Sequence, residues 1–302
     1  MSKVFTRTFR VRWSEVDETG WMAVAHYLRY LVETALDWGA AGHLSMDDIG
    51  ALGQVWVIRE TDLTFYRPLQ YNDRFDFTIW LVQWRRVRGT RAFELTHHDS
   101  GKVIAQGVQQ VVSLDARTLR PTSAPDYLRE YFKIDHPRTF PQQPFPRVPP
   151  APQAAFVMQW QVEKQDIDHD AIVNNAVYVD YAEEAAARLL DGAGWSPDRL
   201  KGEGLAVRPR RLHIQYQAPA IWGDRLRLAT HLLELGDQGW TQYVAIQRDR
   251  DGTGIVECLL EWQVLDRASG QVQPVPAPLA HALQLRISDT DNTRSGGGST
   301  TP

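Results

Sequence analysis

The sequence predicts an α+β protein made of two tandem copies of one module, each with one long helix wrapped by a curled antiparallel sheet. The first observation is a repeat. Residues 166–186, DIDHDAIVNNAVYVDYAEEAA, align with residues 15–35, EVDETGWMAVAHYLRYLVETA, at a shift of 151. The second is the length of 302 residues, which suits two domains of about 150 residues. The third is that each copy contains one helical pattern followed by several strand patterns.

The repeat extends through both halves of the chain. The identical pairs in the first segment are Asp17/Asp168, Ala25/Ala176, Tyr27/Tyr178, Tyr30/Tyr181, Glu33/Glu184 and Ala35/Ala186. Further along, the same shift aligns Arg59/Arg210, Pro68/Pro219, Asp73/Asp224, Thr90/Thr241, Gly101/Gly252 and Asp115/Asp266. One shift without a net gap over about 100 residues indicates two copies of one module.

A proline-rich segment and a polar segment predict the boundaries of the two modules. Residues 137–152, PRTFPQQPFPRVPPAP, contain seven prolines, which are poorly compatible with a helix or a central strand. The last residues, SDTDNTRSGGGSTTP, have almost no apolar side chains to bury. We therefore expect a first module at 1–136, a Pro-rich linker at 137–154, a second module at 155–287 and a disordered tail at 288–302.

Each copy begins with an alternating segment and continues with a helix. FRVRWSEV (9–16) and FVMQWQVE (156–163) have the period of two that is typical of half-buried strands. Residues 25–42 place apolar side chains three and four positions apart, which predicts a helix, and Gly39 and Gly42 provide its end. The segments 63–69, 74–84, 90–99 and 102–115 then predict a meander of about four strands.

Composition excludes several classes of function. The formal net charge is −4 and the pI is about 6.1, so no basic surface is expected for nucleic acid. The single cysteine, Cys258, excludes an internal disulfide and favours a reducing compartment; mid-strand, it is expected to be buried and inert. The sequence contains no signal-peptide pattern or apolar run of membrane-spanning length, so we expect a cytoplasmic protein. It also contains no glycine-rich phosphate loop, zinc spacing or nucleophile elbow, and no cofactor is predicted.

The turn before each helix contains the candidate chemistry. Asp17 and Asp168 could attack a carbonyl or activate water, and the unpaired backbone N–H groups at a helix start could stabilise an oxyanion. Gly20 would let a substrate carbonyl approach the backbone. The alternative is that both aspartates are helix caps or turn residues, because aspartate is favoured at both positions.

Several neighbouring residues have two interpretations. Asp166, Asp168 and Asp170 alternate, but Ala171 and Val177 occupy the positions where a calcium loop needs Gly and Glu, so no metal site is predicted. Repulsion among the three carboxylates would instead keep Asp170 partly protonated, as a hydrogen-bond donor. Asn174 and Asn175 either cap the helix or orient the aspartate and a water.

The helix itself offers a second acid in each copy. Glu33 and Glu184 are either solvent-exposed residues or second carboxylates of the site, with Arg59 and Arg210 as their expected partners.

This order of elements and the residues of the first turn resemble those of the hotdog-fold thioesterases. Asp17-Glu-Thr-Gly20 followed by Tyr27 resembles the turn of 4-hydroxybenzoyl-CoA-type thioesterases. Asp168 followed by Val173-Asn174-Asn175 and Tyr178 resembles the turn of acyl-ACP thioesterases, and the tandem arrangement over residues 5–285 is similar to that family. The chain departs from the acyl-ACP pattern where the catalytic asparagine falls on Asp170 and the catalytic histidine on Ile172; in the first copy the histidine position is Trp21.

The resemblance implies an enzyme of fatty acid metabolism that hydrolyses acyl thioesters carried on CoA or acyl carrier protein, with no nucleic-acid or membrane partner. The alternatives are a non-catalytic acyl-binding or regulatory protein, and a hydratase or dehydratase, although neither turn contains an evident histidine base. The implied catalytic residues are Asp168, Asp17, Asp170 and Asn174. The implied substrate-binding residues are Gly20, Trp21, Tyr27, Asn175, Tyr178, Glu33 and Glu184.

The two copies are expected to pack edge to edge as an intrachain pseudo-dimer, and a homodimer of the whole chain is left open. The turns of the two copies differ: the first has the apolar Trp21, Met22 and Val24 where the second has Ile172, Val173 and Asn175. We therefore expect the chemistry to depend on Asp168, while Asp17 lines a second or degenerate site. Chain length, carrier and pathway are not fixed by the sequence.

Overall fold

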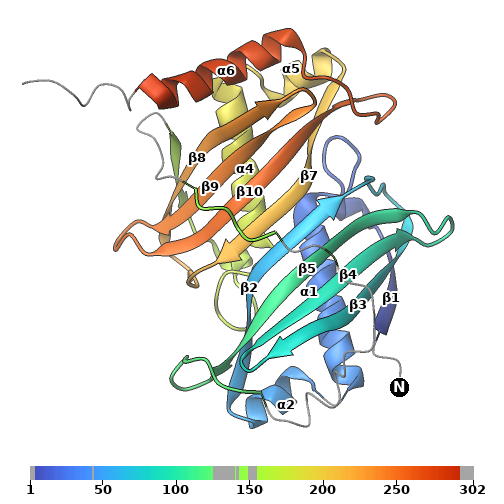
Figure 1. The fold of residues 1–302 in the computed structure, drawn as a ribbon, viewed down its shortest axis with the longest axis vertical. Helices are drawn as coiled ribbons and strands as arrows, with labels where there is room; N and C mark the ends of the chain where they lie inside the picture. The colour runs from blue at the N-terminus through green and yellow to red at the C-terminus, as the bar shows by residue number, and fades with distance from the viewer. Residues whose placement is uncertain (1–3, 43, 125–139, 141–142, 149–154, 293–302) are drawn as a thin grey trace, which may run out of the picture. The chain divides into compact units, whose positions relative to one another are not determined.

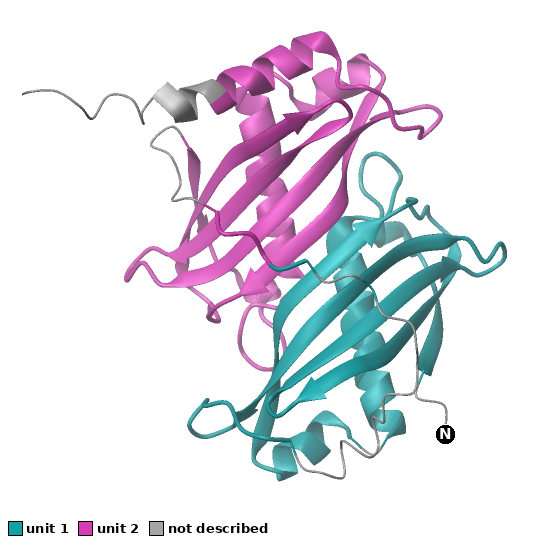
Figure 2. Cartoon of the chain, viewed as in Figure 1, with its two compact units in different colours: residues 1–144 teal, residues 145–302 magenta. Residues whose placement is uncertain are grey.

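The computed structural model describes residues 4–42, 44–124, 140, 143–148 and 155–292, and it forms two compact units, residues 1–144 and 145–302 (Figures 1 and 2). The division between Pro144 and Phe145 falls inside the predicted Pro-rich linker. Of that linker, residues 140 and 143–148 have neither helix nor strand, and the other linker residues before 155 lie outside the described residues.

The first unit contains one long helix and an antiparallel sheet. Its strands are β1 (Val4–Arg10), β2 (Gln54–Phe65), β3 (Arg74–Arg85), β4 (Arg88–His97) and β5 (Val103–Asp115), and they pair in the order β1-β3-β4-β5-β2. The helix α1 (Val24–Ala41) packs against the sheet, chiefly on β3, and a short helix α2 (Met46–Ala51) follows it.

The second unit repeats this plan. Its strands are β6 (Phe156–Gln161), β7 (Leu205–Tyr216), β8 (Arg225–Gly236), β9 (Gly239–Arg248) and β10 (Gly254–Asp266), in the order β6-β8-β9-β10-β7. The long helix is α4 (Val177–Gly192), and the short helix α5 (Pro197–Gly202) corresponds to α2. These units are the predicted α+β hotdog modules, each a helix and a curled antiparallel sheet. How the two modules pack against each other remains a prediction.

The strand registers match at the same shift of 151 that aligns the sequences. Phe77 pairs with Leu95 between β3 and β4, and their counterparts Leu228 and Ile246 pair between β8 and β9. Likewise Leu63 faces Gly107, and Ile214 faces Cys258. The repeat in the sequence is therefore a repeat of three-dimensional pairing.

An aromatic cluster forms the core of the first unit where the helix meets the sheet. The Tyr30 ring lies 4.6 Å from Phe9 and 5.1 Å from Phe75, centroid to centroid. Leu28 and Leu31 on the same face of α1 are 0% and 1% exposed. Full burial of such side chains contributes about 1.5–3 kcal/mol each, so this face of α1 fixes the helix on the sheet.

Several predictions of the element boundaries are wrong. The strand predicted at 63–69 is β2, Gln54–Phe65, and the alternating segment predicted at 156–163 ends at Gln161. The strand predicted at 9–16 ends at Arg10, and a 3₁₀ turn, η1 (Trp13–Glu15), follows it. This turn buries Glu15, which is 7% exposed, and leaves Trp13 74% exposed with its ring edge-on to Tyr71. The alternation fails because a hydrogen bond from Tyr30, described below, holds Glu15 inside.

The chain end also differs from the prediction. The tail was expected to be disordered from residue 288, but a final helix, α6 (Ala277–Asn292), continues through residue 292, and residues 293–302 lie outside the described residues. Leu279 and Leu283 are fully buried, and α6 packs on β8. Arg286 donates a hydrogen bond to the carbonyl of Gly192 at the end of α4. In the described part of the chain, no helix is long and apolar enough to cross a membrane.

Candidate functional site

The turn before each long helix has the same backbone geometry in both modules. The Asp17 N–H donates to the Trp21 carbonyl at 2.9 Å, and the Asp168 N–H donates to the Ile172 carbonyl at 2.9 Å. Isolated bridges, Val16 with Met22 and Ile167 with Val173, close each turn. The two predicted aspartates therefore occupy one and the same position of a repeated hairpin.

The aspartates are turn residues and not helix caps. The N-cap positions of α1 and α4 are Ala23 and Ala176. In each turn the aspartate Oδ1 instead accepts the backbone N–H two residues ahead, from Thr19 at 2.7 Å and from Asp170 at 3.0 Å. These bonds orient the carboxylates and, since a carboxylate has about four acceptor sites, leave acceptor capacity for a substrate or water.

Partial desolvation in the turn makes both carboxyl groups weaker acids than usual, although by surface area Asp17 is exposed and Asp168 is half-buried. It raises the pKa of Asp17, against hydrogen bonds from Thr19 that lower it. It also raises the pKa of Asp168, against the backbone hydrogen bond from Asp170; the Asp170 carboxylate raises it further. Once ionised, a carboxylate of raised pKa is a stronger base than an ordinary aspartate.

The residue three positions after the aspartate has a left-handed backbone conformation in both turns. Gly20 has φ +82°, and its counterpart Ala171 has φ +60°. A Cβ added at Gly20 would meet no atom within 4 Å, so its backbone angle, rather than a close approach, explains the glycine. Ala171 keeps this conformation at an unfavourable energy, a form of strain that concentrates at functional sites.

An acidic side chain next to each hairpin, buried in Glu15 and half-buried in Asp166, bonds to the long helix. Glu15 Oε2 accepts the Tyr30 hydroxyl at 2.6 Å and the Arg12 N–H at 2.8 Å. At the same repeat positions, Asp166 Oδ2 accepts the Tyr181 hydroxyl and the Glu163 N–H, both at 2.7 Å. These acids were not predicted as part of the site, but the repeat contains the signal: an acid two residues before each aspartate and an identical tyrosine on each helix.

The expected cluster of three carboxylates does not form. Asp166 points to Tyr181, and Asp170 is exposed and reaches Asp168 with its backbone N–H. The prediction that Asp170 is held protonated by two close carboxylates therefore loses its geometric basis. No group of three or more His, Cys, Asp or Glu side chains in the described ranges could hold a metal ion.

The two asparagines have different environments. Asn174 Oδ1 accepts the Ala176 N–H at 3.0 Å, and the Asn174 carbonyl accepts the Val177 N–H at 3.0 Å. Two of the amides that were expected to stabilise an oxyanion at the start of α4, those of Ala176 and Val177, are therefore already bonded. Asn175, in contrast, has a buried Nδ2 without an acceptor among the described residues. At α1 no side chain caps the helix.

Four of the predicted substrate-binding residues lie elsewhere. Tyr27 and Tyr178 are core residues, each 3% exposed; Tyr27 packs edge-on to Phe65, and the Tyr178 hydroxyl accepts the Ala220 N–H at 3.0 Å. The Glu33 side chain is 61% exposed and pairs with Arg7, and Glu184 pairs with Arg188 one helical turn away. Arg210 pairs with Glu261 instead of Glu184. The second-carboxylate interpretation of these glutamates is therefore not supported. Trp21 is buried at 8% exposure, next to Gly20.

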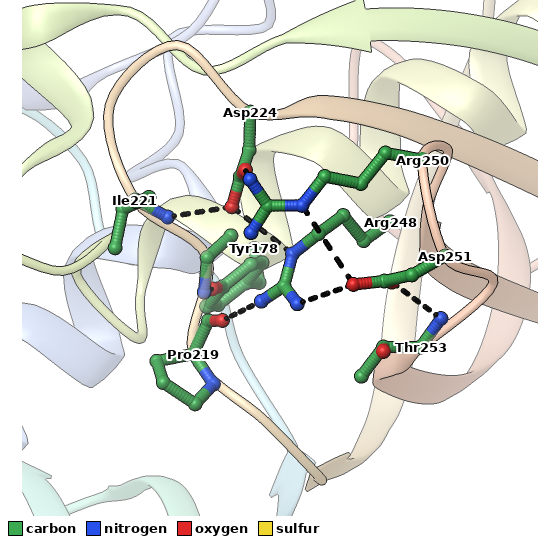
Figure 3. Close-up of polar contacts among 9 residues, drawn as sticks. Tyr178, Pro219, Ile221, Asp224, Arg248, Arg250, Asp251 and Thr253 are labelled. Carbon is green, nitrogen blue, oxygen red and sulfur yellow. Dashed lines mark hydrogen bonds and ion pairs between the residues drawn. The ribbon is translucent and has the colours of Figure 1, made fainter.

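An ion-pair network braces the loop that contacts the second hairpin (Figure 3). The Arg248 guanidinium donates to Asp224 Oδ2 at 3.1 Å, to Asp251 at 3.2 Å and to the Pro219 carbonyl at 2.7 Å. The next carbonyl, of Ala220, accepts the Val173 N–H at 2.9 Å. Arg248 thus fixes the loop that holds the end of the Asp168 hairpin. In the first module His97 takes the place of Arg248, with its Nε2 4.0 Å from Asp73.

Three other features are candidate parts of a site. A cavity of about 260 Å³ is lined by β6, β8, α4 and α6 residues and includes none from the Asp168 turn. Burial lowers the pKa of His26, in the first turn of α1, to about 4, with Arg29 as the second cause, so this imidazole is neutral at pH 7. Cys258 is buried, and burial raises the pKa of its thiol, as expected for an inert residue.

Comparisons with known proteins agree with the repeat. A family model for the thioesterase-like superfamily matches residues 11–132 and again 162–283. The chloroplastic acyl-acyl-carrier-protein hydrolase of Cuphea viscosissima is 19% identical over 282 residues, which cover 90% of this chain and 65% of that protein. This chain thus spans somewhat less than two thirds of the length of that relative.

Solved structures show the same fold over most of the chain. An acyl-ACP thioesterase from Bacteroides thetaiotaomicron superposes with a TM-score of 0.70 at 17% identity, covering 87% of this chain and 100% of the other. The 12:0-ACP thioesterase from Umbellularia californica gives a TM-score of 0.70 at 17% identity, with 86% and 94% covered. With both halves matched by the family model, the chain belongs to the thioesterase-like superfamily as a protein of two hotdog modules.

Proposed function

We propose that this protein is an enzyme that hydrolyses acyl thioesters, releasing a carboxylic acid and a thiol. The observation that carries the proposal is Asp168: a carboxyl of raised pKa, fixed by one backbone hydrogen bond in the turn before α4. It lies in a chain whose halves both match the thioesterase-like family. Asp168 acts as base toward a water or as nucleophile toward the carbonyl carbon.

The expected substrates carry their acyl group on CoA or on acyl carrier protein. The names of the relatives, acyl-ACP hydrolases and thioesterases, favour the second carrier. A reducing, cytoplasmic location remains our expectation from the single cysteine.

The first module supplies a second cleft in this proposal. Its hairpin has the buried, apolar Trp21 and Met22, 8% and 4% exposed. Contact with an acyl chain would suit these side chains, since burial of each methylene contributes about 0.8 kcal/mol. Asp17 would then line this cleft without carrying the main reaction.

One observation favours a second candidate function. The position of the acyl-ACP family's catalytic histidine is Ile172, a side chain that cannot transfer a proton. A protein that binds acyl thioesters without turnover would tolerate this replacement.

A thiol-release assay across acyl-CoA and acyl-ACP chain lengths separates the two. Turnover that is lost in Asp168→Asn supports the hydrolase. Saturable acyl-thioester binding without thiol release from the wild-type chain would support the binding protein instead.

A further inference from the structure

A chain of hydrogen bonds connects Arg248 to the Asp168 hairpin (Figure 3). The Arg248 guanidinium donates to the Pro219 carbonyl at 2.7 Å. The next residue, Ala220, is fully buried, and its carbonyl accepts the Val173 N–H at 2.9 Å. Val173 forms the bridge that closes the hairpin. A shift of the Pro219–Ala220 segment would therefore move the hairpin and its aspartate.

The same segment is held from the helix by Tyr178. The Tyr178 hydroxyl accepts the Ala220 N–H at 3.0 Å, so both polar groups of the Ala220 residue are bonded. Burial raises the pKa of Tyr178 to about 12, and the charges of Arg248, Asp224 and Asp168 all act on its hydroxyl. The groups that hold the segment and the candidate aspartate therefore lie within electrostatic reach of one buried hydroxyl.

The shape of the guanidinium suits it to fixing this segment. Its three nitrogens donate to three different groups: Nε to Asp224 at 3.1 Å, Nη1 to Asp251 at 3.2 Å and Nη2 to the Pro219 carbonyl. A planar fork fixes the directions of its bonds, whereas the ammonium of a lysine is a point charge on a flexible stem. Arg248 therefore sets the position of the Pro219 carbonyl relative to two carboxylates.

The first module has the same loop contact but a different cation. The Leu69 carbonyl accepts the Met22 N–H at 2.7 Å, as the equivalent pair does in the second module. In place of Arg248 the first module has His97, whose Nε2 lies 4.0 Å from Asp73, beyond the length of a hydrogen bond. An imidazole has two nitrogens and cannot make the three bonds of the guanidinium. The first hairpin thus lacks the three-point fork that holds the second.

We propose that Arg248 is a positioning residue for Asp168: it holds the Pro219–Ala220 segment and, through it, keeps the hairpin closed around the carboxyl group. The inference rests on the proposed hydrolase function, and it gives a physical reason why the second hairpin, rather than the first, carries the reaction. A misplacement of about 1 Å caused far from the reacting atoms lowers a rate by up to about 10²-fold, so a loosened hairpin is expected to reduce turnover.

Kinetics of Arg248→Lys test this. The change removes the fork but keeps a positive charge beside the buried Asp224, so folding is expected to be preserved. We expect kcat for thiol release to fall by about 10–10²-fold, with little change in KM. The same change at Arg250, which is 64% exposed and pairs with the same aspartate, is the matched control and should leave kcat unchanged. Full kcat in Arg248→Lys would overturn the inference. If Arg248→Lys fails to fold, Arg248→His, which installs the residue of the first module, replaces it in this comparison.

The pH dependence of kcat/KM separates a positioning role from a general loss of stability. A loosened hairpin admits water to the Asp168 carboxyl group, so desolvation raises its pKa less, and the midpoint should move down toward about 3.9 in Arg248→Lys. Because Arg248 acts through Asp168, the change should cause no further loss of kcat in an Asp168→Asn background. A midpoint equal to that of the wild type, or losses that multiply in the double variant, would overturn the inference.

Carboxyl ¹³C NMR of protein with labelled aspartate gives a readout that does not depend on turnover. The Asp168 resonance is identified by its absence from the spectrum of Asp168→Asn, and its titration gives the pKa directly. A pKa of Asp168 that is lower in Arg248→Lys but unchanged in Arg250→Lys supports the inference, and an unchanged pKa in both overturns it. A wild-type chain that releases no thiol from any acyl thioester defeats the proposed function, and this titration then decides on the positioning role of Arg248 alone.

Discussion

The Tyr181 hydroxyl lies 2.7 Å from Asp166 Oδ2, and the Tyr30 hydroxyl lies 2.6 Å from Glu15 Oε2 at the same positions of the other module. Each bond ties the long helix to the chain segment two residues before the candidate aspartate. The tyrosines are identical and the acids differ by one methylene, so both modules make the same contact with acidic side chains of different length. This contact fixes the position of the hairpin relative to the long helix.

Tyr30→Phe and Tyr181→Phe are expected to destabilise the protein by about 1.5–3 kcal/mol each, since a hydrogen bond to an acidic side chain is lost. The acid left behind is buried in the first module, Glu15, and half-buried in the second, Asp166. The larger effect is expected for Tyr30, because Glu15 is 7% exposed. Urea unfolding followed by tryptophan fluorescence measures the loss. Tyr66→Phe, with its exposed hydroxyl, is the matched control and should cost much less. Equal losses of unfolding free energy in all three variants would show that the contacts with the acids contribute no more stability than an exposed hydroxyl does.

Exchanging the left-handed residues of the two hairpins should change stability in opposite directions. Gly20→Ala is expected to cost about 1 kcal/mol, because a Cβ there meets open space and only the φ of +82° opposes it. Ala171→Gly should stabilise by a similar or smaller amount, since it relieves the strain at φ +60° but gives the unfolded chain more freedom. Both are measured by urea unfolding. A loss of stability in Ala171→Gly would contradict the assignment of strain.

Arg248→Met should be far more damaging than Arg250→Met. Asp224 is 3% exposed at its side chain, and Arg248 at 14%. Removing Arg248 leaves this buried carboxylate with the Ile221 N–H at 3.1 Å and the exposed Arg250 at 3.6 Å. Breaking a buried pair costs about 3–5 kcal/mol. Arg250 is 64% exposed, and its loss should cost less than about 1 kcal/mol. Thermal and urea unfolding compare the two; similar losses would mean that the network in Figure 3 is not a brace.

Asp17→Asn should stabilise the protein at neutral pH. The folded pKa of Asp17 is raised, so the carboxyl contributes stability that is fully present below its unfolded pKa of about 3.9 and is lost as the pH rises through the folded value. The variant does not titrate. Its Tm should therefore exceed that of the wild type most at pH 7, and the difference should shrink toward zero as the pH falls toward 4. A Tm difference that grows on acidification would have the wrong sign.

The duplicated architecture was predictable because two signals agree. The shift of 151 predicts equivalent elements, and the period-2 and helical patterns predict what those elements are. The structure confirms the equivalence, down to the register that pairs Leu63 with Gly107 and Ile214 with Cys258. It confirms the type of most elements but not all of their boundaries, since the strand predicted at 9–16 ends at Arg10. The final helix α6 was not predicted, because prolines precede and begin it (Pro274, Pro276 and Pro278), although Leu279 and Leu283 recur four residues apart.

The site was predictable only in part. Aspartate in the turn is a local pattern, and the structure places both aspartates there. The contacts that shape their surroundings connect residues far apart in sequence, such as Tyr216 with Asn175 and Arg248 with Asp224. Local patterns do not encode such pairs. The roles of Asn174 and Asn175 also depend on which of the two lies at the helix start. Helix boundaries predicted from sequence are uncertain by one or two residues, which is too coarse to decide this.

The central claim is that Asp168 carries thioester hydrolysis. The most direct measurement is kcat/KM for thiol release as a function of pH, in the wild type, Asp168→Asn and Asp17→Asn, with Tm recorded for each. The account predicts a wild-type rate that rises with pH as Asp168 loses its proton, with a midpoint above the usual aspartate value of about 3.9. Asp168→Asn should lose about 10²–10⁴-fold, together with this rising limb, whereas Asp17→Asn should keep most activity. Full turnover in Asp168→Asn with activity abolished in Asp17→Asn would contradict the account and assign the chemistry to the first module.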